Sequence, residues 1–374
     1  MATYGFLSSL PPTQCGLATF SDALAGAMTT PTDTAIGVRV VDASDSTLPA
    51  ASHITVVATL VNGDPASVTA AATALNGADV AVVQHEYGIY GGPDGDEVLD
   101  LMARLHVPII AVLHTVLDDP LPHQKEVLEA VMRRADVSVV MSQAGLDRLR
   151  DIYDVDASRV MLIPHGVAPP TGSREPSEEA PVVLTWGIIG PGKGIEWGIR
   201  AMTHLSDMQR RPTYRIVGGT HPKVLARVGE AYRTSLIEEV RRLGVEDAVE
   251  FHCGYLDRDA LSLHIRAASV VLLPYDSTTQ VTSGVLAEAI ALGIPVVATA
   301  FPDAIELLST GAGIVVPHRD PEALAKAVRW ILTHPDDALE MSRIGVAWGA
   351  QAHWPVIGAR YRAIASKIRM GAIA

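Results

Sequence analysis

The chain has 374 residues, 48% of them hydrophobic, and a formal net charge of −13. This length predicts two domains with a sizeable core, and no apolar run of the sequence is long enough to span a bilayer. Residues 1–165 carry 20 acidic and 8 basic side chains, and residues 166–374 carry 22 and 21, so the first half holds −12 of the net charge. The acidic excess of residues 1–165 repels polyanions such as nucleic acids and anionic lipid surfaces. We therefore expect neither nucleic-acid binding nor strong membrane association.

The first residues, MATYGFLSSLPP, lack the basic segment of a secretory signal. The two cysteines, Cys15 and Cys253, lie far apart in the sequence, which is typical of a reduced compartment and not of a disulfide framework. We therefore expect a cytoplasmic protein.

The first half alternates short apolar runs with helical patterns, which is typical of a parallel sheet covered by helices. Its predicted strands span residues 4–7, 36–41, 54–60, 80–84, 109–113, 137–141 and 160–163. A loop rich in turn residues, SLPPTQCG, follows the first strand, and helical periodicity begins near Ala18. Taken alone, this loop fits an ordinary strand-to-helix turn as well as a ligand-binding loop.

A polar and aromatic cluster, QHEYGIYGG, spans residues 84–92 directly after a buried strand. Its position suits a ligand site, because α/β proteins bind ligands beyond the carboxyl ends of their strands. His85 and Glu86 suit sugar hydroxyls, and Tyr87 and Tyr90 suit stacking on a pyranose ring. The alternative is a solvated loop with incidental aromatic residues, and the position favours binding.

The strand at 109–113 ends in His114, where a binding role is favoured over that of a satisfied core histidine. The tripeptide Pro-His-Gly at 164–166 then closes a first domain of residues 1–167. The proline-containing stretch of mixed charge at 168–180 predicts a linker, and residues 168–349 predict a second domain.

The second domain opens with a strand at 182–186 that runs into the loop GIIGPGKG and then a helix. The backbone N–H groups of such a loop, together with Lys193, form a phosphate cradle, although the spacing is not that of a P-loop. Further strands are predicted at 214–219 and 249–256, the latter containing a glycine turn before Tyr255 and Leu256.

The stretch VVLLPYDSTTQVTSGVLAEAIALGIPVVATA, at residues 270–300, predicts strand, loop, helix, turn and strand. Its first four residues form an apolar run buried on both faces. Ser283 and Gly284 open the helix, whose free N–H groups face the region beyond the strand end. Glu288 lies just over one turn further on, and Gly293 caps the helix. A second phosphate-binding element is therefore predicted here.

The last part of the chain predicts two helical segments. Residues 321–332 form an amphipathic pattern, and an aromatic and aliphatic stripe at helical spacing lies in a helix of about residues 350–374. The stripe consists of Trp354, Ile357, Tyr361 and Ile364, and we interpret it as core or interface.

Together these motifs resemble the donor-binding signature of the family 4 glycosyltransferases (glycosyl transferases group 1), which have the GT-B fold. Glu288 and the sequence GIPVV at 293–297 resemble the second half of that signature, and Lys193 resembles the lysine of the family's diphosphate-binding loop. The resemblance follows the family's order along nearly the whole chain. It implies an α/β protein of two Rossmann-like, doubly wound domains facing each other across a cleft, with the C-terminal helix packed back on the first domain.

The resemblance also implies roles for individual residues. The implied catalytic residues are His114, Lys193, Gln280 and Glu288. The implied donor-binding residues are Gly16, Gly190, Gly192, Lys193, Tyr255, Leu256, Thr282, Ser283, Gly284, Val285 and Glu288. The implied substrate-binding residues are Gln14, His85, Glu86, Tyr87, Tyr90 and His114. The lysine and the N–H groups of residues 282–285 would stabilise the departing diphosphate. The histidines and carboxylates lack metal-ligand spacing, so we expect neither a metal nor a separate cofactor.

Two positions depart from the family pattern. Ile188 stands where the family has an arginine on the diphosphate, so one of two cations is missing, with Arg215 or another arginine as a candidate substitute. Gln280 stands where the family has the first of two glutamates; an amide can both accept and donate hydrogen bonds. The loss of charge-assisted bonds there would cost about 1–2 kcal/mol, too little to imply an inactive enzyme.

Three functions fit these features. The leading one is a retaining glycosyltransferase that moves a hexose from a nucleoside diphosphate sugar, with GDP-mannose favoured, to a soluble acceptor. The second is a GT-B phosphorylase or sugar-nucleotide epimerase, of which a phosphorylase would need more cations near Lys193. The third is a nucleotide-sugar-binding partner protein in which Ile188 and Gln280 reflect lost catalysis. Donor turnover without a partner protein separates the third from the first.

Overall fold

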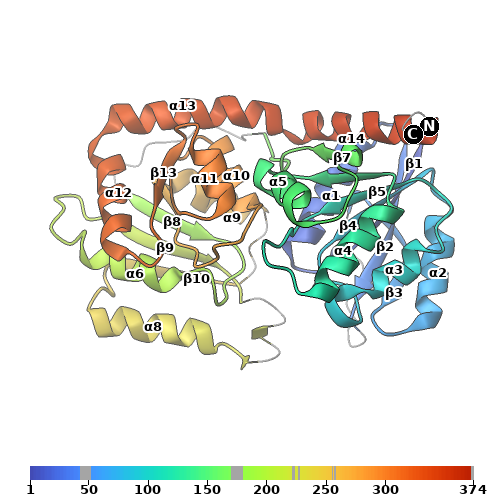
Figure 1. Ribbon diagram of the computed structural model, residues 1–374. Coiled ribbons are helices and arrows are strands. Elements are labelled where there is room, and N and C mark those ends of the chain that lie inside the picture. Colours follow the sequence, from blue (N-terminus) through green and yellow to red (C-terminus); the bar gives the residue numbers. More distant parts are fainter. Residues whose placement is uncertain are drawn as a thin grey trace. The chain divides into compact units, whose positions relative to one another are not determined.

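The computed structural model describes residues 1–42, 52–169, 180–220, 224–225, 228–254, 256 and 258–371. The chain divides into two compact units (Figure 1). Unit 1 comprises Met1–Gly166 with Ala352–Ala374, and unit 2 comprises Val167–Gln351. Each unit is built on a parallel sheet, which confirms the predicted α/β class.

The sheet of unit 1 has seven strands within the described residues. In spatial order they are β3 (Thr55–Val61), β2 (Thr34–Val41), β1 (Thr3–Ser8), β4 (Val80–His85), β5 (Ile109–Leu113), β6 (Val137–Val140) and β7 (Val160–Leu162). The order reverses between β1 and β4, where Leu7 pairs with Val83. Open α/β sheets bind ligands at such a switch point, beyond the carboxyl ends of the strands.

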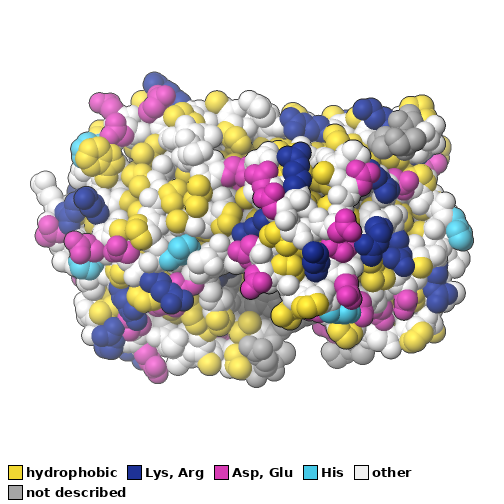
Figure 2. Space-filling view, viewed as in Figure 1, with side chains coloured by type: hydrophobic (Ala, Val, Ile, Leu, Met, Phe, Trp, Pro, Cys, Tyr) yellow, Lys and Arg dark blue, Asp and Glu magenta, His cyan; other side chains and the backbone are white. Residues whose placement is uncertain are grey.

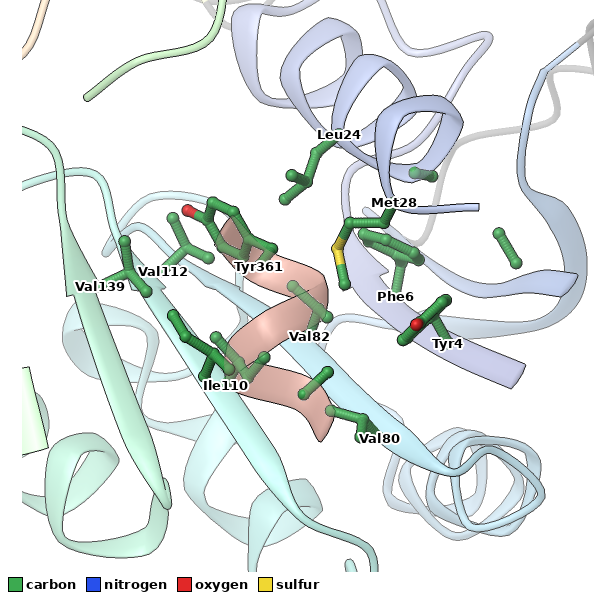
Figure 3. Close-up of a cluster of buried hydrophobic side chains, with 14 of the residues drawn as sticks. Tyr4, Phe6, Leu24, Met28, Val80, Val82, Ile110, Val112, Val139 and Tyr361 are labelled. Carbon is green, nitrogen blue, oxygen red and sulfur yellow. The ribbon is translucent and has the colours of Figure 1, made fainter. Parts of the chain in front are cut away.

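The helices of unit 1 are α1 (Gly16–Met28), α2 (Pro65–Leu75), α3 (Glu97–Met102), α4 (Pro122–Arg134), α5 (Gln143–Ile152) and α14 (Trp354–Arg369). Side chains of α1 and α14 cover one face of the sheet. Figure 3 shows Tyr361 of α14 over Val112 and Ile110, with Leu24 and Met28 of α1 nearby. Tyr361 is only 1% exposed. Burial of this aromatic stripe explains why residues so far from the first domain in sequence belong to unit 1.

The sheet of unit 2 has six strands within the described residues. Their order is β10 (Val249–Cys253), β9 (Thr213–Gly218), β8 (Val182–Trp186), β11 (Val270–Leu273), β12 (Val296–Thr299) and β13 (Gly313–Val316). The helices are α6 (Ile195–Thr203), α8 (Ala231–Leu243), α9 (Arg258–Ala267), α10 (Gly284–Ala291), α11 (Pro302–Leu308), α12 (Pro321–Thr333) and α13 (Pro335–Ala352). Here the order reverses between β8 and β11, the two strands that carry the predicted phosphate-binding elements.

The C-terminal region differs from its prediction. The sequence predicts one helix over about residues 350–374, whereas the structure has α13, which ends at Ala352, and α14, which begins at Trp354. The two are separated at His353, whose backbone is extended (ψ 139°), and Pro355 follows within the first turn of α14. A proline is tolerated there because the N–H groups of a first helical turn have no intrahelical acceptor. The predicted linker at 168–180 lies mostly outside the described residues.

On the face shown in Figure 2, acidic and basic side chains are interspersed on each unit. Ion pairs between described residues include Arg148 with Asp118 in unit 1 and Arg200 with Glu239 in unit 2.

Candidate functional site

The glycine-rich loop after β8 is docked on the chain that follows β11. The backbone N–H of Asp276 donates to the carbonyl of Gly192 at 2.9 Å, and the N–H of Lys193 donates to Gly190. Gly194 has a φ of 59°, and a Cβ atom there would collide with the carbonyl oxygen of Pro274. Only glycine therefore lets the loop lie against this backbone, which holds Gly190, Gly192 and Lys193 at the switch point of the sheet.

Lys193 is held by an aromatic ring from the neighbouring strand end. Its Nζ lies 4.1 Å from the ring centroid of Tyr275, a cation–π contact. The tyrosine is buried and stacks on Phe301 at a centroid distance of 5.3 Å. The ammonium group is thus kept at the carboxyl ends of β8 and β11, where the sequence places the donor diphosphate.

The N-terminus of α10 faces the same edge. Ser283 caps the helix, with its Oγ accepting from the N–H of Leu286 at 3.3 Å. The backbone N–H of Ser283 is itself occupied, because it donates to the carboxyl group of Asp303 at 2.6 Å. Gly284 and Val285 occupy the first two helical positions, whose N–H groups have no acceptor within the helix. Of the predicted N–H groups at 282–285, that of Ser283 is therefore taken, whereas those of Gly284 and Val285 lie in the first helical turn.

Asp303 lies at the beginning of α11 and is 4% exposed. Burial raises the pKa of its carboxyl group well above the usual value, and the nearby charge of Glu306 acts in the same direction. The hydrogen bond from Ser283 opposes both effects. Because this carboxyl group accepts from Ser283, its ionisation changes the charge beside the N-terminus of α10.

Gln280 contributes to the same loop through its amide. Its Nε2 donates to the backbone carbonyl oxygen of Thr282 at 2.9 Å, and the backbone carbonyl of Gln280 accepts from the N–H of Asp303. A glutamate cannot donate the first of these bonds. The departure from the family pattern therefore has a structural role in this chain.

The remaining donor-site candidates lie around these elements. Glu288 is half-buried in the second turn of α10. Leu256 packs against the core around β8 and β11, and Tyr255 lies outside the described residues. Arg215 cannot supply the missing cation from its present position, because it lies within β9 and its guanidinium donates to Glu250 at 2.9 Å.

In unit 1, the equivalent edge gathers neutral polar groups. The Nε2 of His114 lies 2.7 Å from the Oε1 of Gln84, and the imidazole packs edge-on against Phe20 of α1. Because the amide oxygen only accepts, His114 carries its proton on Nε2 and its Nδ1 is left as an acceptor.

Burial lowers the pKa of His114 to about 3, and the nearby imidazoles of His165 and His85 add to this shift. Burial also lowers the pKa of His85 and of His165 to about 4. All three rings are therefore neutral near pH 7, and none attracts an anion by charge.

Glu86 and the two tyrosines have distinct environments. Thr115 donates to Glu86 at 2.6 Å, while burial raises the pKa of this carboxyl group. Tyr87 donates to the carbonyl of Gln124 at 3.2 Å and packs edge-on against His85. Tyr90 is 5% exposed, and its hydroxyl donates to the backbone carbonyl of Gln84. It therefore supports the end of β4 and does not offer a stacking surface. His85 is 1% exposed and is likewise interior.

Four buried polar atoms at this edge have no hydrogen-bond partner: Ser8 Oγ, Thr13 Oγ1, Gln84 Nε2 and His85 Nδ1. Buried groups of this kind are costly, at about 1–3 kcal/mol each, unless a ligand or water satisfies them. They lie at the ends of β1 and β4 or in the loop after β1, beside the switch point. Gln14 and Gly16, from the same loop, are exposed. The half-buried polar side chains that a ligand can reach at this edge include Glu86, Tyr87 and His114.

Comparisons with known proteins identify the family. The family model described as Glycosyl transferases group 1 matches residues 180–334, and that described as Glycosyltransferase Family 4 matches residues 51–169. The chain belongs to the family 4 (group 1) glycosyltransferases.

Curated relatives of this glycosyltransferase-family chain include proteins named D-inositol 3-phosphate glycosyltransferase. Those from Kineococcus radiotolerans and Salinispora arenicola are each 30% identical to it, over 290 and 284 residues. Each match covers 67% of this chain but only 65% and 60% of the respective relative.

Among solved structures, sucrose-phosphate synthase from Thermosynechococcus elongatus is similar with a TM-score of 0.76 and 20% identity, covering 99% of this chain and 100% of that one. Anabaena HepE in complex with UDP and glucose is similar with a TM-score of 0.77 and 18% identity, covering 98% and 100%. These similarities confirm the GT-B fold of the family member described here.

Three residues around the donor loop of this family member were not among the sequence candidates. Asp276 and Asp303 follow the strands β11 and β12, and Arg319 follows β13. Their position after strand ends was a usable signal, but their partners lie on other segments and cannot be read from spacing. Within the described residues, no helix has the length and apolarity needed to cross a membrane.

Proposed function

We propose that this protein is a retaining glycosyltransferase that moves a hexose from a nucleoside diphosphate sugar to a hydroxyl group of a soluble acceptor. One observation carries the proposal: Lys193 lies in the loop after β8 and the N-terminus of α10 follows β11, and the order of the unit 2 sheet reverses between these two strands. A cation beside free backbone N–H groups is a site for a diphosphate.

In the proposed reaction, the bond between the sugar and the diphosphate breaks and negative charge accumulates on the departing phosphate. Lys193 and the N–H groups of Gly284 and Val285 stabilise that charge without rearranging. Glu288 accepts from the ribose hydroxyls. The departing phosphate takes the acceptor proton on the same face, which accounts for retention of configuration.

The polar edge of unit 1 is proposed to bind the hydroxyl-bearing substrates. The Nδ1 of His114 accepts from a sugar hydroxyl, and the half-buried Glu86 supplies a further polar group. A neutral histidine suits this role because it binds hydroxyls without requiring charge. The names of the curated relatives make D-inositol 3-phosphate the first acceptor to assay.

The donor nucleotide is also part of the proposal. The sequence favours GDP-mannose, whereas the similar Anabaena structure holds UDP and glucose, so both nucleotides belong in the test. The two cysteines are free, in agreement with the proposed cytoplasmic site of action.

A titration panel without added metal tests the proposal, using GDP, UDP and ADP with their common sugar conjugates. We expect one nucleotide to bind clearly and its sugar conjugate to be turned over. Lys193→Ala should weaken diphosphate binding about 10-fold to 100-fold, as expected for loss of a charge-assisted contact. Lys326→Ala, at an exposed position on α12, is the matched control. If no nucleotide binds the wild-type protein, the proposal is wrong.

The alternative is a nucleotide-sugar-binding partner protein with weakened catalysis. The absence of an arginine at position 188 and the structural use of the Gln280 amide favour this alternative. The two functions separate on turnover: slow hydrolysis of the bound donor by the purified protein supports the transferase. Tight binding with no hydrolysis or transfer supports the alternative.

A further inference from the structure

Arg319 approaches the donor loop from the end of β13. Its Nε lies 3.2 Å from the Oδ1 of Asp276, and its side chain is 66% exposed. The backbone N–H of Asp276 is the group that donates to Gly192 in the glycine-rich loop. One residue therefore joins the arginine to the loop that carries Lys193.

A second contact fixes the segment around Arg319 at the same place. The Nδ1 of His318 lies 2.9 Å from the carbonyl oxygen of Tyr275, the residue whose ring lies beneath Lys193. The two cations thus contact consecutive residues, Lys193 on Tyr275 and Arg319 on Asp276. A second cation therefore contacts the segment that follows β11.

The backbone of Arg319 is also unusual. Its φ is 58°, a left-handed conformation that glycine adopts readily and a long side chain disfavours. Strained conformations of this kind cluster at functional sites, where the surrounding structure maintains them. An exposed salt bridge with Asp276 is weak by itself and does not account for the strain.

We propose that Arg319 is the second cation of the diphosphate site and takes the role left open by Ile188. In the empty protein its guanidinium pairs with Asp276. When the donor binds, the long side chain turns from Asp276 to the diphosphate, where a guanidinium binds phosphate oxygens in a bidentate manner. Asp276 keeps its backbone bond to Gly192 and its carboxylate then retains the hydrogen bond from the Trp197 indole, at 3.0 Å. This inference rests on the proposed diphosphate donor.

The test compares Arg319→Gly with the wild-type protein by isothermal titration calorimetry, using the nucleoside diphosphate selected by the panel and its monophosphate. We expect diphosphate binding to weaken about 10-fold and monophosphate binding to change little, because the second phosphate is the group at issue. Glycine also relieves the left-handed strain, so the melting temperature should rise by about 1–3 °C. A variant that is more stable yet binds the diphosphate less well cannot be explained by unfolding.

Arg329→Ala is the matched control, since it removes one arginine of the same unit that pairs with Asp207. Arg319→Lys should recover part of the affinity. If Arg319→Gly binds the diphosphate as the control does, Arg319 is not the second cation, although the proposed function stands. If the wild-type protein binds no nucleoside diphosphate, the proposed function fails and this inference fails with it.

Discussion

The amide nitrogen of Gln280 donates to the carbonyl oxygen of Thr282, 2.9 Å away, and so shapes the loop that leads into α10. This bond explains how a residue that departs from the family pattern fits its position. It also predicts that restoring the family glutamate will not improve the site.

Gln280→Glu should weaken donor binding about 5-fold and lower the melting temperature, because the carboxylate loses the bond and faces the Thr282 carbonyl. Nucleotide titration and thermal unfolding measure both effects. Gln351→Glu, at an exposed position near the end of α13, is the control for added charge. Tighter donor binding or faster turnover by Gln280→Glu would show that the Gln280 amide has no structural role of its own and that glutamate is the better residue at this position.

Gly194→Ala and Gly192→Ala form a matched pair within the donor loop. Both glycines have positive φ, at 59° and 87°, but only at Gly194 would a Cβ atom collide with the carbonyl of Pro274. We expect Gly192→Ala to cost about 1 kcal/mol in unfolding free energy, from backbone strain alone. Gly194→Ala should cost about 3 kcal/mol and also displace Lys193. Urea unfolding measures the costs, and equal values for the two variants would contradict the docked loop.

Asp303→Asn tests the buried carboxyl group at the N-terminus of α10. The pKa of Asp303 is raised in the folded state, so its contribution to stability is fully present below the unfolded value of 3.8 and is lost as pH rises through the folded pKa. Asparagine keeps an acceptor for the Ser283 N–H but carries no charge. The variant should therefore be more stable than the wild type at pH 8, with the difference shrinking toward pH 4.

The measurement is urea unfolding across that pH range. Asp320→Asn removes the same charge from the N-cap of α12, where the side chain is half-buried, and serves as the control. If Asp303→Asn is less stable than the wild type at pH 8, the ionised carboxylate of Asp303 stabilises the folded protein and the interpretation is wrong.

The histidines of unit 1 predict acid sensitivity. The pKa of His85 is lowered to about 4, against 6.5 when unfolded, so its contribution to stability is present above pH 6.5 and is lost as pH falls toward 4. For this interior group the shift corresponds to about 3 kcal/mol. His85→Gln should remove that part of the pH dependence, measured as the difference in unfolding free energy from the wild type.

His123 is a control of opposite sign. Its pKa is raised, first by the hydrogen bond to Asp94 and then by nearby carboxylates, so the stability it contributes is present below pH 6.5 and is lost as pH rises through the folded pKa. His123→Gln should therefore lose stability at pH 6 and little at pH 8. The same pH dependence for both variants would show that neither histidine titrates as described.

Much of this molecule was predictable from the sequence. Runs such as VAVVQH and VVLL are apolar because both faces of a parallel strand are buried, so they predict the strands and the α/β class from local pattern alone. Glycines and a lysine after a strand end predict a phosphate-binding loop, because a phosphate cradle needs close backbone approach and positive charge. The structure confirms the position of this loop after β8, and its binding of a donor stays a prediction.

Only the tertiary structure decided which groups meet. Asp303 reaches Ser283 across 20 residues and Arg319 reaches Asp276 across 43, and such contacts depend on strand order and helix placement, which no local pattern encodes. The two tyrosines after β4 also differ in burial, since Tyr90 faces the interior and Tyr87 is half-buried. The sequence predicts the same stacking role for both. Local pattern thus determined the elements and the family, whereas long-range packing determined the charges, tautomers and free donors of the site.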